Sequence, residues 1–101
     1  MLIRENHSDK IVEAYAIYWS DRKRHYFFIP YPGYEGLQAT DEYSCELISD
    51  DLTNFEIFRN ENGDDLILHK AIEGYRLLDR LIDYDAEAMA EFLSNLKAYT
   101  S

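Results

Sequence analysis

The sequence predicts an α+β domain in which an antiparallel β-meander of four to five strands is followed by two C-terminal helices packed on one face. Segments rich in β-branched and aromatic residues lie between positions 11 and 69, and the apolar period becomes helical from residue 71 onward. Strands first and helices last is the order typical of α+β proteins. A chain of 101 residues without a linker or repeat predicts a single domain, residues 1–101.

A hairpin is predicted near the N-terminus. Residues 11–19 are apolar on both parities, with Ala14, Ala16 and Tyr18 on one face, which is typical of a central strand. A five-residue polar connection, residues 20–24, leads to a partner strand over residues 25–31. Residues 1–5 form either a short strand or a lead-in.

Turn-forming residues divide the middle of the chain. Residues 32–40 contain a proline and two glycines and are predicted to be a loop. Further strands are predicted over residues 42–48, 54–59 and 65–69. The dipeptide Asn62-Gly63 favours a hairpin turn between the last two strands, because both residues tolerate positive φ.

Two amphipathic helices are predicted to close the chain. The first covers residues 71–84, with Gly74 weakening its first turn. Asp85 is a favourable N-cap for the second helix, which we expect to run through Tyr99. On that second helix the inward stripe is predicted to be Ala86, Met89, Ala90, Leu93 and Leu96. The core is predicted to depend on Leu78, Leu81, Ile82, Met89 and Leu93.

Nearly all of the net charge lies in one stretch of the sequence. Residues 35–65 hold ten carboxylates and one cation, Arg59, which gives -10 + 1 = -9 of the chain's -10. Holding like charges close together opposes the compact state. Two explanations stay open at this point, solubility of an acidic face or recognition of a cationic partner.

No arrangement typical of an enzyme is found, so we expect a protein without catalytic activity, cofactor or metal. His7, His25 and His69 lack metal-ligand partners at short spacing, and His69 is predicted to pack in the core or cap an element. The single cysteine, Cys45, is predicted to pack in the core, with a thiol–imidazole pair to His25 or His69 as the alternative. Adjacent acids in turns are expected to be solvated.

Composition also sets expectations about location. The chain has no apolar leader and no stretch of 18 uncharged apolar residues. An acidic surface is repelled by nucleic acid and by anionic lipid. We therefore expect a cytoplasmic protein with no direct contact to nucleic acid or membrane. Its high like charge predicts a monomer when free.

A tyrosine-containing loop adjoins the acidic stretch. Rigid aromatic side chains flanked by carboxylates are typical of surfaces that bind cationic proteins, and a turn that covers the end of the sheet is the alternative. We predict a partner-binding surface for a basic protein, made of two tyrosines and seven carboxylates: Tyr31, Tyr34, Glu35, Asp41, Glu42, Asp50, Asp51, Asp64 and Asp65.

Three segments resemble the small acidic immunity proteins of bacterial toxin systems, including contact-dependent inhibition. They are YPGYEGL (31–37), TDEYSCELISDDLTNFEIF (40–58) and LLDRLIDYDAEAMAEFL (77–93). The resemblance implies an immunity or inhibitor protein that neutralises a cognate basic toxin such as a nuclease, and it assigns a role to no single residue. The alternative is a phage-type nucleic-acid mimic that blocks a defence nuclease, which predicts two rows of carboxylates along an elongated surface.

Overall fold

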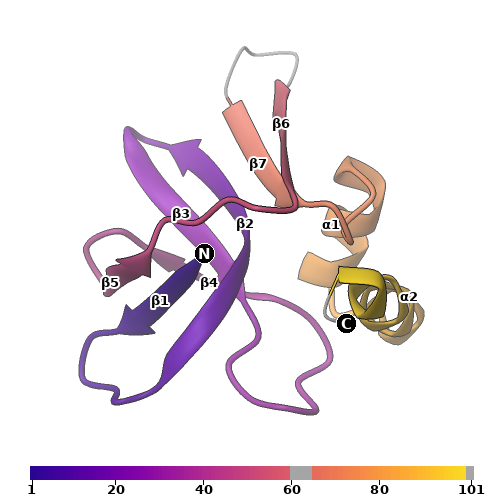
Figure 1. The fold of residues 1–101 in the computed structure, drawn as a ribbon, viewed down its shortest axis with the longest axis horizontal. Coiled ribbons are helices and arrows are strands. Elements are labelled where there is room, and N and C mark those ends of the chain that lie inside the picture. Colours follow the sequence, from indigo (N-terminus) through magenta and orange to yellow (C-terminus); the bar gives the residue numbers. More distant parts are fainter. Residues whose placement is uncertain (60–64, 100–101) are drawn as a thin grey trace.

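The computed structural model describes residues 1–59 and 65–99, in which seven antiparallel strands precede two helices (Figure 1). The strands are β1 (Leu2–Glu5), β2 (Ile11–Ser20), β3 (Lys23–Phe28), β4 (Gln38–Asp41), β5 (Cys45–Ser49), β6 (Phe55–Arg59) and β7 (Asp65–His69). The helices are α1 (Tyr75–Ile82) and α2 (Ala86–Leu96), followed by a 3-10 turn, Lys97–Tyr99. The predicted α+β class is confirmed. The predicted four to five strands are too few, because β1 is a full strand and β4 lies inside the predicted loop.

Strand β2 is the centre of the sheet. It pairs with β3 on one side, while on the other side its first half pairs with β1 and its second half with β7. Ile17 therefore has a partner on each side, Tyr26 of β3 and Ile67 of β7. The predicted central position of this strand is confirmed. The predicted meander holds only for β1 to β4, since β5 pairs with β1 and the β6–β7 hairpin joins the sheet through β7.

A β-bulge at Tyr15 changes the direction of the side chains along β2. Ala14 pairs with Phe28, and Ala16 pairs with the adjacent Phe27, so Tyr15 is an extra residue in β2. Because side chains alternate along a strand, the extra residue turns both Tyr15 and Ala16 toward the helices, whereas Ala14 faces the opposite side. The predicted grouping of Ala14 with Ala16 on one face is wrong for this reason.

The first five strands curl into an open barrel. Their order is β4-β3-β2-β1-β5, so β4 and β5 lie at opposite ends of the path. Four strand spacings in a flat sheet would separate them by about 19 Å. The four residue steps from Asp41 to Cys45 reach at most about 14 Å. The sheet therefore curves until its ends meet, where the Cys45 thiol donates a hydrogen bond to the Asp41 carbonyl oxygen at 3.3 Å.

Two hydrophobic clusters lie on the two faces of β2. One fills the inside of the curved sheet and consists of Met1, Ile3, Ala14, Ile17, Tyr26 and Phe28. The other lies between the sheet and the helices, and its largest members are Phe27, Leu68, Ile72, Leu78, Leu81 and Phe92. Both helices belong to the second cluster, so they cover the same face of the sheet.

The start of α1 lies one turn later than predicted. Ala71 and Ile72 are fully buried before the helix begins, and Gly74 precedes it with a φ of 130° that L side chains rarely adopt. His69 is also buried, and its Nδ1 accepts a hydrogen bond from the backbone N–H of Ala71 at 3.0 Å. The prediction that His69 packs in the core or caps an element is thus confirmed, since its side chain is buried.

The inward face of α2 differs from the predicted stripe. Its buried residues are Ala88, Met89 and Phe92, whereas Ala90 is exposed and Leu93 is 42% exposed. Among the other predicted core residues, Leu78, Leu81 and Met89 are buried and Ile82 is half-buried. Apolar residues cover so much of this helix that two stripes fit its periodicity, and packing against the sheet selects one of them. The N-cap prediction is confirmed, since Asp85 accepts hydrogen bonds from the backbone N–H groups of Glu87 and Ala88.

The hairpin between β2 and β3 is tighter than predicted. Ser20 pairs with Lys23, which leaves a two-residue turn of Asp21 and Arg22. Both turn residues have positive φ, 53° and 63°, as a type I′ turn requires. The predicted five-residue connection is wrong because Asp-Arg carries neither the glycine nor the asparagine that normally marks such a turn.

Candidate partner-binding site

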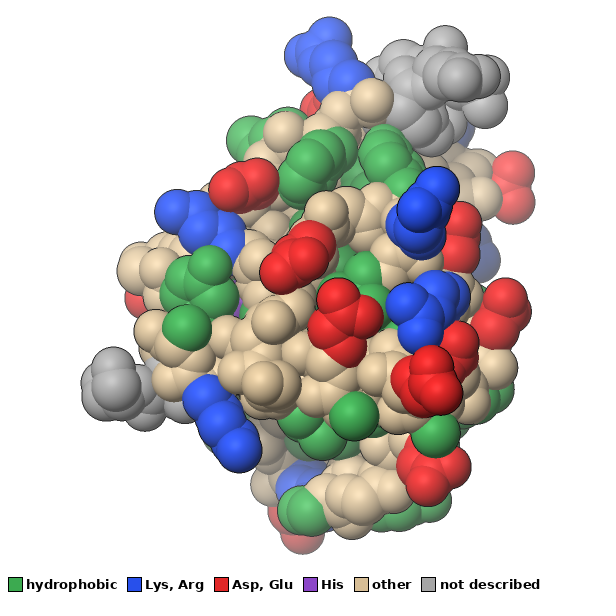
Figure 2. Space-filling model, turned by 90° about the vertical axis from the view of Figure 1, so that its right-hand side faces the viewer, with side chains coloured by type: hydrophobic (Ala, Val, Ile, Leu, Met, Phe, Trp, Pro, Cys, Tyr) green, Lys and Arg blue, Asp and Glu red, His purple; other side chains and the backbone are tan. Residues whose placement is uncertain are grey.

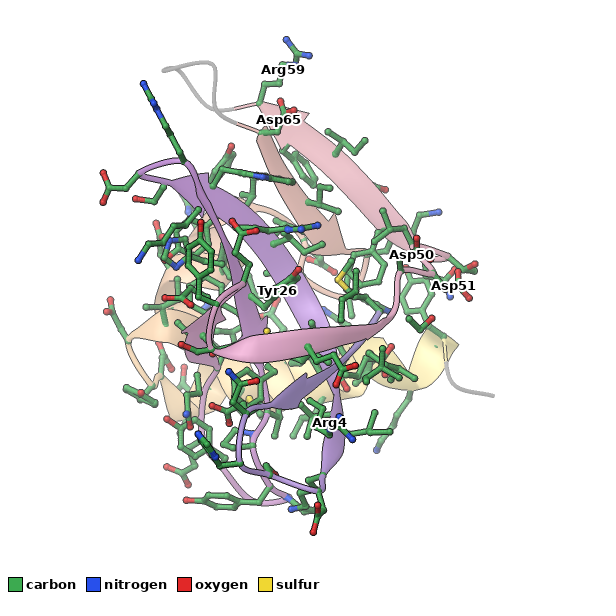
Figure 3. All side chains as sticks on the ribbon, turned by 90° about the vertical axis from the view of Figure 1, so that its left-hand side faces the viewer. Arg4, Tyr26, Asp50, Asp51, Arg59 and Asp65 are labelled. Carbon is green, nitrogen blue, oxygen red and sulfur yellow. The ribbon has the colours of Figure 1, made fainter. Side chains whose placement is uncertain are left out.

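The predicted site residues fall in separate parts of the fold. Tyr31, Tyr34 and Glu35 lie in the loop between β3 and β4, which passes beside the helices in Figure 1. Asp41 and Glu42 lie at the β4–β5 turn, Asp50 and Asp51 on the link to β6, and Asp65 at the start of β7, away from that link (Figure 3). Asp64 and the predicted Asn62-Gly63 turn lie outside the described residues. The structure thus brings the two tyrosines and Glu35 together and leaves the other described carboxylates elsewhere.

The carboxylates at the β4–β5 turn have structural roles. One oxygen of Asp41 accepts hydrogen bonds from the backbone N–H groups of Tyr43 and Ser44, at 2.9 and 3.0 Å. Glu42 accepts a hydrogen bond from the backbone N–H of Arg24 at 2.9 Å. Both acids also face cations of β3, with Lys23 3.8 Å from Asp41 and the Arg24 guanidinium 3.7 Å from Glu42. The field of these two acids is therefore partly neutralised within the chain.

Other acids of the stretch are also engaged locally. Asp51 accepts hydrogen bonds from the hydroxyl and the backbone N–H of Thr53, and these bonds lower the pKa of the Asp51 carboxyl. Asp65 lies 3.4 Å from the Arg59 guanidinium, and Figure 3 labels both residues. Such exposed ion pairs contribute about 0–1 kcal/mol each to stability, but they reduce the local net charge.

Three tyrosines form a chain of rings at one end of the molecule. Tyr31 and Tyr34 meet edge to face at 5.4 Å between centroids, and Tyr34 meets Tyr84 in the same way at 5.7 Å. The Tyr34 hydroxyl donates a hydrogen bond to the Tyr84 hydroxyl at 2.8 Å, and this bond raises the pKa of Tyr34 to about 12. Tyr31 and Tyr84 are 55% and 54% exposed. The cluster is ordered by its own contacts and still presents ring surface to solvent.

The loop that carries Tyr31 and Tyr34 is fixed against the end of α1. The backbone N–H of Leu37 donates to the carbonyl oxygen of Leu81 at 3.3 Å, and the Leu37 side chain is buried in the core. Gly36 lies so close to α1 that an added Cβ would be 2.6 Å from the Tyr84 ring and 2.8 Å from the Leu81 carbonyl oxygen. Glycine is therefore required there by close approach, and this contact sets the position of the tyrosines.

Tyr84 is the residue that the sequence did not indicate. It follows α1 with a φ of 60°, a left-handed conformation that glycine normally supplies at the end of a helix. A non-glycine residue held in that region stores about 1–3 kcal/mol of backbone strain, and such strain clusters at functional sites. Tyr84 thus adds a third ring to the loop tyrosines although fifty positions of sequence separate it from Tyr34.

The segments that carry and adjoin this tyrosine cluster are rich in carboxylates. The loop residues 29–37 and the helical residues 79–91 together carry Glu35, Asp79, Asp83, Asp85, Glu87 and Glu91 against one cation, Arg80, which gives -6 + 1 = -5. Half of the chain's net charge therefore lies on these 22 residues. Figure 2 looks onto the side that carries the helices and shows carboxylates interspersed with Lys and Arg side chains and with apolar side chains.

Arg80 neutralises only part of that charge. Its guanidinium lies 2.9 Å from Asp85 and 3.7 Å from Glu91, and its hydrogen bond lowers the pKa of the Asp85 carboxyl. Within residues 1–59 and 65–99, no cation lies within 4 Å of the remaining four acids, Glu35, Asp79, Asp83 and Glu87. All four are exposed. We name Tyr31, Tyr34, Tyr84 and these four acids the tyrosine–acid surface.

The described residues form neither the alternative thiol–imidazole pair at Cys45 nor a group of metal ligands. Burial raises the pKa of the Cys45 thiol, which is bonded to a backbone carbonyl rather than to an imidazole. In the described part of the chain, no three His, Cys, Asp or Glu side chains are grouped to hold a metal ion. What the tyrosine–acid surface can do chemically is bind cations through carboxylates and ring faces.

Comparison of the chain with models of protein families finds no matching model, and comparison with curated proteins and with solved structures finds no significant match. Among the described residues, no helix combines the length and the apolar character needed to cross a membrane.

Proposed function

We propose that this protein is an immunity or inhibitor protein that binds and neutralises a cognate basic toxin, such as a nuclease, through the tyrosine–acid surface. The observation that carries the proposal is the coincidence of half the net charge with three ordered, partly exposed tyrosines. Tyrosine supplies large contact area with few rotatable bonds, so little conformational entropy is lost when a partner covers it.

The electrostatics support a cationic partner. The four exposed acids of the tyrosine–acid surface have no cation within 4 Å among residues 1–59 and 65–99, so they raise the local concentration of a basic protein and speed its association. Desolvated tyrosines at the centre and carboxylates at the rim are the usual composition of a high-affinity interface. The same composition serves an inhibitor that must capture its target quickly.

The overall shape favours this proposal over a nucleic-acid mimic. The principal extents are 35 × 31 × 25 Å, so the domain is nearly isometric. A mimic of a duplex requires carboxylates repeated along an elongated surface. Here four exposed acids, Glu35, Asp79, Asp83 and Glu87, lie on the loop and helices that carry the tyrosine cluster, which suits a compact contact with another protein.

The test is a binding measurement with the product of the adjacent reading frame, by surface plasmon resonance, which gives both the association rate and the affinity. Tyr34→Ala is expected to weaken binding by about 2 kcal/mol or more, as truncation of a central interface residue does. The double variant Glu35→Gln with Glu87→Gln is expected to lower the association rate and the affinity, because both exposed acids lie on the tyrosine–acid surface.

Matched controls distinguish the effect of substitutions on the tyrosine–acid surface from the effect of lowering the total net charge. Asp9→Asn with Glu56→Gln removes the same two charges from exposed positions elsewhere, and Asp50→Asn tests the competing acidic segment. We expect these variants to bind nearly as wild type. The proposed surface is wrong if Asp50→Asn abolishes binding while Tyr34→Ala does not, and the proposed function is wrong if no basic product of a neighbouring frame binds at all.

A further inference from the structure

An apolar groove opens beside the tyrosine cluster. It lies between the loop after β3 and helix α2 and has a volume of about 420 Å³. Its wall on the loop side includes Ile29 and Pro32, and its floor on α2 includes Ala86, Met89, Ala90 and Leu93. This volume falls in the range of about 300–1,000 Å³ that is typical of binding sites for small molecules and side chains.

Apart from the buried Met89, the floor of the groove is the apolar stripe of α2 that does not enter the core. Ala86, Ala90 and Leu93 follow one another at spacings of four and three residues, so they form one ridge along the helix. Ala86 and Ala90 are exposed, and Leu93 is 42% exposed. Small residues on such a ridge allow a second helix to approach within about 8–10 Å of the α2 axis.

Negative charge borders the groove. Glu35 and Tyr34 line it directly, and Glu87 lies on the first turn of α2 next to Ala86. The groove thus lies within the segments that carry the net charge of -5. An occupant of matching chemistry has apolar side chains for the floor and cations for the rim.

We propose that the groove binds a cationic amphipathic helix of the protein partner, with leucine-sized side chains against Ala90 and Leu93 and lysine or arginine toward Glu35 and Glu87. This inference rests on the proposed function in taking the partner to be a basic protein, and it adds the secondary structure and the chemistry of the segment that is bound. Helix-in-groove recognition reads apolar anchors at i, i+3 or i+4, and i+7.

A second hollow beside α1 does not offer the same complementarity. It has a volume of about 380 Å³ and is lined by Tyr18, Trp19, Phe27, Asp65, Leu66, Tyr75, Leu78 and Ile82. Its one carboxylate, Asp65, already faces Arg59 at 3.4 Å. Of these two hollows, the groove at α2 is therefore the better match for a cationic occupant.

The test uses a synthetic probe, a peptide of about five helical turns with leucine on one face and lysine on the other. Binding is followed by titration and by chemical-shift changes of the backbone amides. We expect binding to wild type, with the largest shifts at residues 32–35 and 86–93. Ala90→Trp, which fills the groove, is expected to weaken binding about tenfold or more, whereas Ala98→Trp, the same exchange at an exposed position that does not line the groove, is expected to leave it unchanged.

The controls separate shape from charge. A peptide of the same composition in scrambled order keeps the charge and loses the apolar face. Equal binding of the scrambled peptide, or wild-type binding by Ala90→Trp, overturns the inference. If circular dichroism shows that Ala90→Trp is unfolded, Leu93→Lys decides in its place, because it puts a cation in the groove at a partly exposed position.

The outcomes also distinguish this inference from the proposed function. If a basic toxin binds wild type and Ala90→Trp equally well, the proposed function is supported and the proposed role of the groove is contradicted. A peptide that binds in the groove, combined with no binding of any basic neighbour product, supports the groove and contradicts the function.

Discussion

His69 is a buried residue whose protonation state is tied to folding. Its side chain is 4% exposed, and Tyr15, Phe55 and Tyr99 surround it edge to face at 5.2 to 5.8 Å between ring centroids. Nδ1 accepts the hydrogen bond from Ala71, so the neutral ring is the form that the fold requires. Burial accordingly lowers the pKa of His69.

Stability is therefore expected to fall as the pH falls below about 6.5, the ordinary pKa of histidine in an unfolded chain. Below that pH the unfolded chain takes up a proton that the folded state excludes, so the free energy of unfolding decreases until the lowered folded-state pKa is reached. Above about 6.5 the contribution of His69 is fully present. Urea denaturation between pH 7.5 and 5.0, as rough limits, measures this slope.

His69→Gln is the matched control, because glutamine keeps an acceptor and does not titrate in this window. We expect the variant to be less stable at pH 7 but to lose less stability on acidification. Identical pH profiles for the two proteins would contradict the assignment of a buried, neutral imidazole.

At the scale of elements, the leucines of the two helices have different roles: some fill the core and others line the groove. Leu81 of α1 is fully buried between the sheet and the helices, whereas Leu93 of α2 borders the groove. Leu81→Ala is expected to lower the free energy of unfolding by about 2–5 kcal/mol, the usual effect of a core cavity. Leu93→Ala is expected to cost less than about 1 kcal/mol, because surface substitutions rarely cost more.

The measurement is chemical denaturation of both variants, with binding of the partner recorded in parallel. Leu93→Ala is expected to weaken binding more than it weakens folding, and Leu81→Ala the reverse. A loss of several kcal/mol on Leu93→Ala would show that this side chain packs in the core, and the assignment of Leu93 to a binding groove would then be wrong.

The elements also set the limit of what the sequence could predict. The positions of β2, β3, β5, β6 and β7, the helical period near the C-terminus and the Asp85 cap depend on local chemistry, and all were predictable. The bulge at Tyr15 and the turn at Asp21 and Arg22 depend on cross-strand pairing. The short β4 has only four residues, too few for a period to be recognised. The stripe of α2 that is buried was not predictable, because two stripes fit the helix equally well.

The tyrosine–acid surface was predictable only in part. Tyr31, Tyr34 and Glu35 are adjacent in sequence and carry a local pattern of aromatic, glycine and acidic residues. Tyr84 and the acids near the α1–α2 turn are distant from this loop in sequence. They lie near it only because the loop packs on the end of α1. Conversely, the density of acids in residues 35–65 did not reveal that cations of β1 and β3 face them.

At the scale of the whole molecule, the uneven charge predicts opposite effects of salt on folding and on binding. Screening acts over about 10 Å at 0.1 M salt. It relieves repulsion among the exposed acids, so stability is expected to stay constant or rise with NaCl. It also weakens attraction to a basic toxin, so the association rate is expected to fall by about tenfold or more from low to high salt.

Stopped-flow mixing with the toxin and thermal denaturation at the same salt concentrations measure the two effects. An association rate that does not change with salt would indicate an interface driven by apolar contact alone. Loss of stability with salt would instead show that the ion pairs of the fold outweigh its self-repulsion.

The position of β2 has a consequence for synthesis of the chain. Ala16, Ile17 and Tyr18 pair with Leu68, Ile67 and Leu66, which lie about fifty residues later. At roughly 5–20 residues per second, a ribosome needs about 2.5–10 s to add that length. During that interval the hydrogen-bonding groups on this edge of β2 have no strand to meet, and an unpaired apolar edge is a site of aggregation. The nascent chain is thus most vulnerable after its barrel strands have emerged and before β7 has, so a ribosome stalled within that window would leave a fragment prone to pair with other chains.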